Sequence, residues 1–473
     1  MDAATPEGTL DGVALAEATP SLSSARAGHP VSYETTLWIA RAGRIAVVWL
    51  PIWALCVGHF PTSNSALVAS VVYLCIWKAT LRRAYADHTV TVWTVGATVP
   101  AIVGGVCGAL FAAPIALSVP RLHLSLFTLA ELTVAVIIGS TIWESTVASS
   151  LAARRRILLV GTEGGGTDLL EDVSLARPRL PFEVIGVVDD TRTTDQIAGV
   201  PLHGTVEDLA EIVGEQKPQI VVLANDRCRA AAFERLVAVG HLGFSVVGLP
   251  EFYEYAFGRL PVRNLTPQWF MSILHLYRRP YSELTKRIFD LVVATAVLTI
   301  VWPVLPLVAL LVWRTRGPLV FRQVRLGEAG KPFTIYKFRT MARDAERDGP
   351  VWASEGDPRV TDIGRFMRKT RLDELPQLWN VFKGDMSFVG PRPERPEFVA
   401  ELEAEVPFWS RRHLVKPGIT GWAQVRRGYT ADAAGTGDKL SYDLWYLRHR
   451  SLVVDIAICV KTISTLLSGS GAR

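Results

Sequence analysis

Residues Lys286–Trp313 read KRIFDLVVATAVLTIVWPVLPLVALLVW, and this run determines how everything after it is arranged. The run is long and apolar enough to enter a bilayer, but Pro303 and Pro306 interrupt it. Each proline removes a helix hydrogen bond and disfavours the helical conformation of its predecessor. The sequence therefore predicts a helix with a sharp bend near Trp302.

Cations flank this run on both sides. They are Arg278, Arg279, Lys286 and Arg287 before it, and Arg314, Arg316, Arg322 and Arg325 after it. The positive-inside rule places both flanks in the cytoplasm, which a helix that enters the membrane and returns would satisfy. We therefore predict a re-entrant membrane hairpin over residues 282–316. A kinked helix that crosses the whole membrane is the alternative.

The composition also indicates a membrane protein. The chain has 473 residues, 49% of them hydrophobic, and its mean hydropathy is +0.25, which is too apolar for an ordinary soluble enzyme. The formal net charge is only +5, and no nucleic-acid-binding signature accompanies it, so we expect no nucleic acid partner. The five cysteines have neither the spacing of metal ligands nor that of a disulfide framework.

Four apolar runs lie between residues 37 and 150, after a polar tail over residues 1–36 that we expect to be disordered. Each run is close to the ~20 residues that a transmembrane helix needs. Basic clusters place the amino terminus and everything after the fourth helix in the cytoplasm. Glu131 lies within the fourth run, as a functional-site candidate or as a carboxyl hydrogen-bonded inside the bundle.

Short apolar segments alternate with helical segments over residues 151–265, and they predict a parallel α/β domain of Rossmann-like type. The expected strands are Arg156–Gly161, Val184–Val188, Ile220–Leu223 and Ser245–Leu249. The first turn, GTEGGG over Gly161–Gly166, is a loose dinucleotide loop, and Glu163 in it would repel a pyrophosphate. A structural or regulatory domain, or a spacer, is therefore favoured, followed by a linker over residues 266–281.

Asp373 and Glu374 stand side by side in RKTRLDELPQ, residues 368–377. One carboxylate can attack a phosphorus atom while the other holds the divalent cation that neutralises phosphate charge. An acidic pair in surface salt bridges is the alternative reading.

Several cations nearby are candidates for phosphate binding. Lys337 and Arg339 alternate with apolar residues in FTIYKFRTM, residues 333–341, as on a half-buried strand, and Arg368 lies five residues before Asp373. Pro391 and Pro393 restrict the backbone on both sides of Arg392, which lowers the entropy cost of presenting its guanidinium to a phosphate. Snorkelling at a membrane interface is the alternative for some of these cations.

Together these segments resemble the bacterial polyprenyl-phosphate phosphoglycosyl transferases, the sugar transferases that start cell-surface polysaccharide assembly. The resemblance covers Ser282 to the C-terminus. It is carried by the broken helix and by five segments, namely Tyr336–Arg339, Leu372–Gln377, Lys383–Ser387, Gly390–Pro393 and Lys416–Trp422. The four upstream spans and the α/β domain are similar to those of the larger family members. Arg371 departs from the family pattern, which often has a small polar residue there.

The resemblance implies a monotopic catalytic domain over residues 317–473, on the cytoplasmic face of the bacterial inner membrane. It would transfer hexose 1-phosphate from a UDP-sugar to undecaprenyl phosphate and release UMP, the first membrane step of exopolysaccharide, capsule or O-antigen synthesis. Asp373 would be the nucleophile and form a phosphosugar-aspartate, and Glu374 would bind Mg²⁺. The positions implied for phosphate or substrate binding are Lys337, Arg339, Arg368, Pro391, Arg392 and Pro393.

Larger relatives also imply a homodimer, with membrane lipid and downstream glycosyltransferases as further partners. Two other functions are weighed against the transferase. A membrane-anchored nucleotide-sugar dehydratase needs a Tyr-x-x-x-Lys pair, and no tyrosine here has a lysine four positions later. A non-catalytic scaffold would not need Asp373 and Glu374. The sequence leaves open which sugar is transferred.

Overall fold

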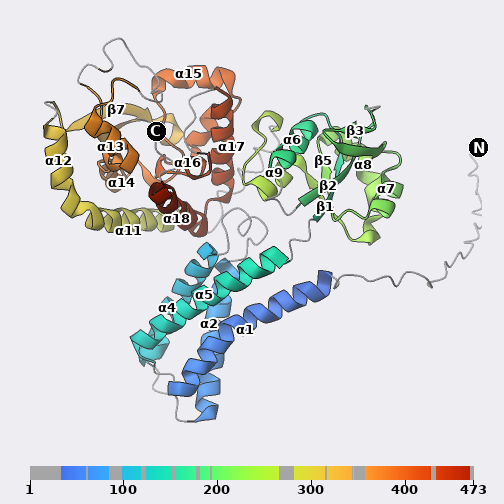
Figure 1. Ribbon diagram of the computed structural model, residues 1–473, viewed down its shortest axis with the longest axis horizontal. Coiled ribbons are helices and arrows are strands. Elements are labelled where there is room, and N and C mark those ends of the chain that lie inside the picture. The colour runs from blue at the N-terminus through green and yellow to red at the C-terminus, as the bar shows by residue number, and fades with distance from the viewer. Residues whose placement is uncertain are drawn as a thin grey trace, which may run out of the picture.

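The computed structural model describes residues 33–59, 62–84, 98–118, 124–150, 155–176, 182–191, 194–265, 282–314, 317–342, 345, 357–427 and 433–468 (Figure 1). Residues 1–32 of the expected tail and the expected linker over residues 266–281 lie outside these ranges. The first helix begins at Tyr33, inside the range expected for the tail.

Four long helices form a bundle at the base of Figure 1. They are α1 (Tyr33–His59), α2 (Ser63–Ala84), α4 (Thr98–Ser118) and α5 (Leu126–Ser150). Small residues let them approach closely, since a Cβ added at Gly108 would lie 2.6 Å from the Trp77 ring. With the helical run Glu283–Trp313, these are the five helices in the described ranges that are long and apolar enough to cross a membrane.

The buried acidic residue of α5 is Glu144, whereas Glu131 is exposed. Among the described residues, the carboxyl of Glu131 has no hydrogen bond of the kind expected inside the bundle. Glu144 is buried near the other end of α5 and accepts a 2.8 Å hydrogen bond from Nη2 of Arg44 on α1. No local pattern predicts this pair, because the two residues are 100 positions apart.

The α/β domain is built on a six-stranded sheet with the order β3-β4-β2-β1-β5-β6. Its strands are β1 (Arg155–Val160), β2 (Phe182–Val188), β3 (Gln196–Ile197), β4 (Val200–Gly204), β5 (Ile220–Leu223) and β6 (Ser245–Gly248). All pairings are parallel except β3 with β4. The four expected strands are therefore confirmed, while the short β3 and β4 were missed.

Helices cover both faces of this sheet. They are α6 (Gly166–Ala176), α7 (Leu209–Gln216), α8 (Asp226–Ala238) and α9 (Leu249–Phe257). Ile157 and Leu159 of β1 belong to the core on one face, and Leu158 and Val160 belong to the core on the other. A sheet buried on both faces explains why its strands are nearly continuous apolar runs.

The apolar run after Ser282 is broken where its prolines predict a bend. Helix α11 (Glu283–Val301) ends at the 3₁₀ turn η5 (Trp302–Val304). Helix α12 (Leu305–Trp313) follows and runs in a different direction from α11 (Figure 1). Val308 and Val312 of α12 pack against Met367 of the next helix, α13 (Asp362–Thr370). This packing holds the bend in place.

The C-terminal domain surrounds two small sheets. Strands β7 (Val320–Leu326) and β8 (Pro332–Phe338) are antiparallel, and β9 (Ser387–Val389) and β10 (Gly418–Thr420) are parallel. After α13 come η7 (Leu372–Glu374), α14 (Gln377–Lys383), α15 (Pro396–Glu405), η8 (Trp409–Leu414), α16 (Trp422–Arg427), α17 (Ala433–His449) and α18 (Leu452–Ser468). The strand character expected around Lys337 is confirmed by β8.

The end of the α/β domain packs directly on the C-terminal domain. We call residues 249–265, which hold α9 and the 3₁₀ turn η3 (Val262–Asn264), the docking segment. Leu260 and Val262 belong to the same apolar core as Trp445 of α17. Trp422 Nε1 donates to the Gly258 carbonyl at 2.8 Å, and Arg448 pairs with buried Glu254 at 2.8 Å. A plain spacer would not share a core in this way.

Candidate active site

Local structure places the adjacent carboxylates in a tight turn between two helices. The Thr361 hydroxyl accepts from Gly364 N at 3.0 Å and caps the start of α13, which ends at Arg371 in the left-handed conformation, φ 59°. The turn η7 follows at once, and in it Asp373 is 7% exposed and Glu374 is 6% exposed. The alternative of a solvated surface pair is therefore wrong.

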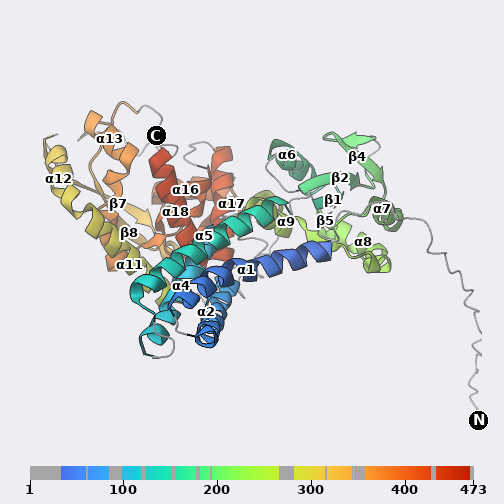
Figure 2. The same cartoon turned by 60° about the horizontal axis from the view of Figure 1, so that its bottom comes forward.

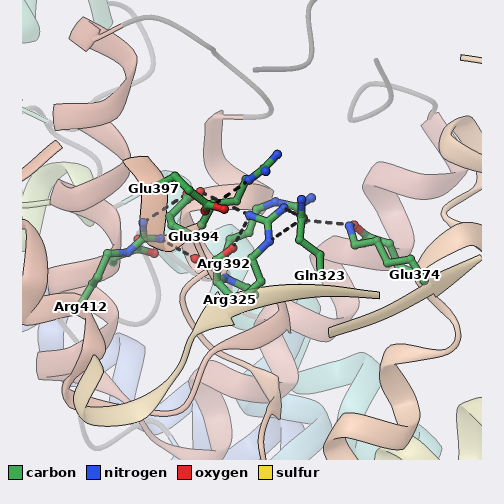
Figure 3. A network of polar contacts seen from close by, with 11 residues as sticks. Gln323, Arg325, Glu374, Arg392, Glu394, Glu397 and Arg412 are labelled. Carbon is green, nitrogen blue, oxygen red and sulfur yellow. Dashed lines mark hydrogen bonds and ion pairs between the residues drawn. The ribbon is translucent and has the colours of Figure 1, made fainter. Parts of the chain in front are cut away.

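Three cations surround Glu374. Figure 3 shows Arg392 beside Glu374, with Arg392 Nη1 3.1 Å from Glu374 Oε1. The same oxygen lies 3.1 Å from Lys337 Nζ, and Glu374 Oε2 lies 3.6 Å from Arg371 Nη1. Burial alone would raise the pKa of Glu374, but these cations, Lys337 first, hold that pKa well below its usual range. Glu374 is a fixed negative charge at neutral pH.

Asp373 has a different environment. Its Oδ1 is buried and has no hydrogen-bond partner in the described parts of the chain. Burial raises the pKa of Asp373, and the charge of Glu374 raises it further, while Lys337, Arg368 and Arg371 oppose both effects. A carboxylate oxygen that is buried, unbonded and next to cations is suited to attack an electrophile rather than to stabilise the fold.

The structure brings most of the expected phosphate-binding residues to this turn. Lys337 reaches it from β8, and burial lowers its pKa, which Glu374 in part restores. Arg368 on α13 donates from Nε to Thr340 Oγ1 at 3.0 Å, and its charge acts on Asp373. Arg339 points elsewhere: its Nε donates to the Pro318 carbonyl at 3.0 Å, beside the loop after α12. A role of Arg339 in phosphate binding stays a prediction.

A buried network of polar side chains, which the sequence did not indicate, contacts the loop Pro391–Pro393 and holds it in place (Figure 3). Arg412 Nη2 donates to the Arg392 carbonyl at 3.0 Å and lies 2.7 Å from Asp443 Oδ2. Arg325 Nη1 donates to the Pro393 carbonyl at 3.1 Å. These backbone contacts fix the loop and so orient the guanidinium of Arg392 toward Glu374.

The residues at this turn fit a magnesium ion. Mg²⁺ in nucleotide enzymes is held by one or two carboxylates, with waters and substrate phosphates completing its shell. Glu374 and the unbonded Oδ1 of Asp373 are donors of that kind. Within the described ranges, no group of three or more His, Cys, Asp or Glu side chains could hold a metal ion. A metal here would therefore depend on the phosphates of a bound substrate.

Comparison with known proteins agrees with this geometry. Residues 281–469 match the family model described as bacterial sugar transferase. The chain is 36% identical to the UDP-glucose:undecaprenyl-phosphate glucose-1-phosphate transferase of Escherichia coli (strain K12). The aligned region has 322 residues and covers 66% of this chain and 67% of that protein. This chain belongs to the bacterial sugar transferase family.

Two further relatives of this sugar transferase both name N-acetylgalactosamine instead of glucose. It is 40% identical over 258 residues to the UDP-N-acetylgalactosamine-undecaprenyl-phosphate N-acetylgalactosaminephosphotransferase of Aeromonas hydrophila, across 54% of this chain and 60% of that protein. It is 50% identical over 128 residues to a putative undecaprenyl-phosphate N-acetylgalactosaminyl 1-phosphate transferase of Bacillus subtilis (strain 168), across 27% of this chain and 72% of that protein.

Residues 79–237 of the sugar transferase match a second model, described as a CoA-binding domain. In this chain, side chains next to the glycine loop Gly161–Gly166 form hydrogen bonds with it. Asp189, at the end of β2, accepts hydrogen bonds from the backbone and side chain of Thr162 and of Thr191, at 2.5–2.7 Å. Although burial raises the pKa of Asp189, these bonds lower it below its usual value. Asn264 also closes on the loop, donating to the Gly164 carbonyl at 2.5 Å.

Proposed function

We propose that this sugar transferase moves a hexose 1-phosphate from a UDP-sugar to undecaprenyl phosphate, releasing UMP. The observation that carries the proposal is the buried pair Asp373 and Glu374, with Lys337, Arg371 and Arg392 around Glu374. Both substrates are anions, so a site for this reaction needs cations that offset their repulsion as well as a nucleophile. The printed activities of the relatives support the same reaction.

The proposed reaction has two steps. In the first, the Asp373 carboxylate attacks the phosphorus that bears the sugar, and the bond from that phosphorus to the bridging oxygen breaks, so that UMP leaves with this oxygen. In the second, an oxygen of undecaprenyl phosphate attacks the same phosphorus and releases the Asp373 carboxylate. Both displacements conserve charge without an external acid or base.

The surrounding residues have separate tasks in this scheme. Lys337 and Arg392 would exchange part of their contact with Glu374 for the phosphate oxygens of the donor, and Arg368 would bind charge near Asp373. Glu374, with the donor phosphates, would hold Mg²⁺, which when bound neutralises charge on the phosphates. Because these groups are already in place, little reorganisation is needed when charge shifts in the reaction.

We propose the following placement in the cell. The broken helix α11–α12 is re-entrant, and the catalytic domain rests on the cytoplasmic face of the bacterial inner membrane as a monotopic unit. The basic residues on both flanks of the broken helix support this arrangement. The lipid acceptor can then keep its chain in the bilayer, which avoids about 0.8 kcal/mol of apolar exposure per methylene. A homodimer and contact with downstream glycosyltransferases stay predictions.

The test is UMP release by the full chain in nanodiscs, with Mg²⁺, undecaprenyl phosphate and a panel of UDP-sugars, because the names of the relatives differ in their sugar. Release with one donor, dependent on the lipid phosphate, would establish the reaction and the donor. Asp373→Asn should lower the rate by at least about a thousandfold. Asp362→Asn, whose side chain is 95% exposed, is the matched control and should keep the wild-type rate. No release with any donor from folded protein would contradict the proposal.

A further inference from the structure

Asp290 is the only acidic residue in the apolar run Lys286–Trp313, and the reaction scheme above gives it no task. It lies on α11 and is 3% exposed. In Figures 1 and 2, α11 runs along the side of the C-terminal domain that is nearest the helical bundle. Acidic side chains within membrane segments are costly to bury, so they are rare and usually serve a function. The contacts of Asp290 indicate a function in the catalytic domain.

Asp290 connects α11 to strand β9. Its Oδ1 accepts a 3.0 Å hydrogen bond from the backbone N–H of Phe388 and a 2.9 Å hydrogen bond from the hydroxyl of Ser387. Asp290 and Ser387 are both buried, so this contact is shielded from water. Hydrogen bonds to an ionised acceptor are roughly twice as strong as those between neutral groups. A single carboxylate of the membrane helix thus holds the start of β9.

Lys286, one turn earlier on α11, restrains the carboxylate of Asp290. Its Nζ lies 3.0 Å from Asp290 Oδ1 and 2.7 Å from Oδ2 of Asp455 on α18. Asp455 is fully buried, and its Oδ1 accepts a 2.8 Å hydrogen bond from the hydroxyl of Tyr446 on α17. A buried ion pair can often be replaced by apolar residues without loss of stability, so stability alone does not explain this network. Its effect is to fix the orientation of Asp290.

Strand β9 leads directly into the loop that carries Arg392. The Pro391 carbonyl accepts a 2.9 Å hydrogen bond from Gly418 N, which continues the pairing of β9 with β10. The backbone is therefore held from the start of β9 up to the residue before Arg392. A shift of β9 would move Arg392 relative to Glu374, whose Oε1 now lies 3.1 Å from Arg392 Nη1.

We propose that Asp290 is a positioning residue for the transferase reaction, because it holds β9, and through β9 the guanidinium of Arg392, in place against α11. This inference rests on the function proposed above, in which Arg392 binds the donor phosphate. Since Asp290 belongs to the membrane helix, donor binding depends on the position of α11. A displaced α11 would lose its bonds to Phe388 and Ser387, and Arg392 would lose its orientation. The catalytic domain is fully active only with α11 docked.

The test is a double-mutant cycle on UMP release by the full chain in nanodiscs. Asp290→Ala should lower kcat/KM for the UDP-sugar by about 10²-fold, the size of effect expected when a binding group is displaced by about 1 Å. In the Arg392→Gln background, Asp290→Ala should change kcat/KM by less than about twofold, because Asp290 acts through Arg392. A purely structural effect of Asp290 would instead multiply with that of Arg392→Gln.

Three further variants separate positioning from loss of folding. Asp290→Asn keeps an oxygen that can accept from Phe388 and Ser387, so it should recover most of the loss seen in Asp290→Ala. Glu283→Gln, at an exposed carboxyl of the same helix, is the matched control and should keep the wild-type kcat/KM. If Asp290→Ala does not fold, Ser387→Ala takes its place in the cycle, because it removes one bond to Asp290 and should lower kcat/KM about fivefold.

Two results would overturn the inference while the wild type releases UMP. A wild-type kcat/KM in the folded Asp290→Ala or Ser387→Ala variant would show that α11 does not position the loop. An equal loss in the wild-type and Arg392→Gln backgrounds would show that Asp290 acts on folding and not through Arg392. Absence of UMP release in the wild type is a different result, because it would contradict the proposed function and this inference together.

Discussion

At the scale of single residues, Asp373 and Glu374 are neighbours in sequence with opposite environments. Three cations surround Glu374, while the Oδ1 of Asp373 has no hydrogen-bond partner in the described ranges. Glu374→Gln removes the charge that Lys337 and Arg392 share, so we expect the rate of UMP release to fall by about 10²–10³-fold while the chain stays folded. A rate within threefold of wild type would show that Glu374 has no part in the reaction.

Arg412 is a second residue whose replacement should change a measurable property, here the stability of the fold, because it holds the loop Pro391–Pro393. Arg412→Met would leave the buried Asp443 without its partner, which costs about 3–5 kcal/mol in the free energy of unfolding. Asp443→Asn in the same chain should recover much of this loss, because it removes the uncompensated charge. Denaturant unfolding of both variants in detergent is the measurement. Equal stability of the wild type and Arg412→Met would contradict the network.

His413 predicts a pH dependence of stability. Burial, and then the charge of Arg412, lower the pKa of His413 from 6.5 to about 4. Between these values the unfolded chain binds a proton that the folded chain does not, so stability falls as the pH drops from about 6.5 to about 4. His413→Gln should flatten this part of the curve of melting temperature against pH. An unchanged slope in the variant would assign the loss to other groups.

At the scale of elements, the bend at Trp302 could be predicted because its cause is local. Pro303 and Pro306 prevent a continuous helix whatever surrounds them. Short motifs also marked Glu374, Lys337 and Arg392, which the structure brings together, while their roles in the reaction stay predictions. Pairings between distant segments, such as Arg44 with Glu144 or Arg412 with Asp443, leave no local pattern. The two-residue strand β3 is likewise too short for a periodic signal.

The bend also gives a test of topology. Replacing both Pro303 and Pro306 by alanine removes the cause of the break, so α11 and α12 should join into one straight span. A cysteine placed at the exposed Leu319 should then be labelled from outside intact cells. With the prolines present, the same cysteine should react only after the membrane is permeabilised. Labelling from outside with the prolines present would contradict the re-entrant helix.

At the scale of the whole molecule, the docking segment joins the α/β domain to the catalytic domain. Glu254 is 5% exposed and pairs with Arg448, and Leu260 lies in the core of the C-terminal domain. The two domains should therefore unfold in one transition. Glu254→Gln removes the buried charge that pairs with Arg448 across the two domains and should separate this into two transitions, measured by calorimetry. Two transitions already in the wild type would contradict the shared core. This contact could not be predicted, because its two sides are 194 positions apart.

The central claim is that Asp373 carries the sugar phosphate between the two substrates. The most direct measurement is the intact mass of the full chain after mixing with its UDP-sugar and Mg²⁺, with no lipid acceptor present. We predict a mass increase of one sugar phosphate, located on the peptide that contains Asp373 and matched by one equivalent of UMP. Undecaprenyl phosphate should then remove it. An unmodified mass, with UMP released only when both substrates are present, would contradict the claim.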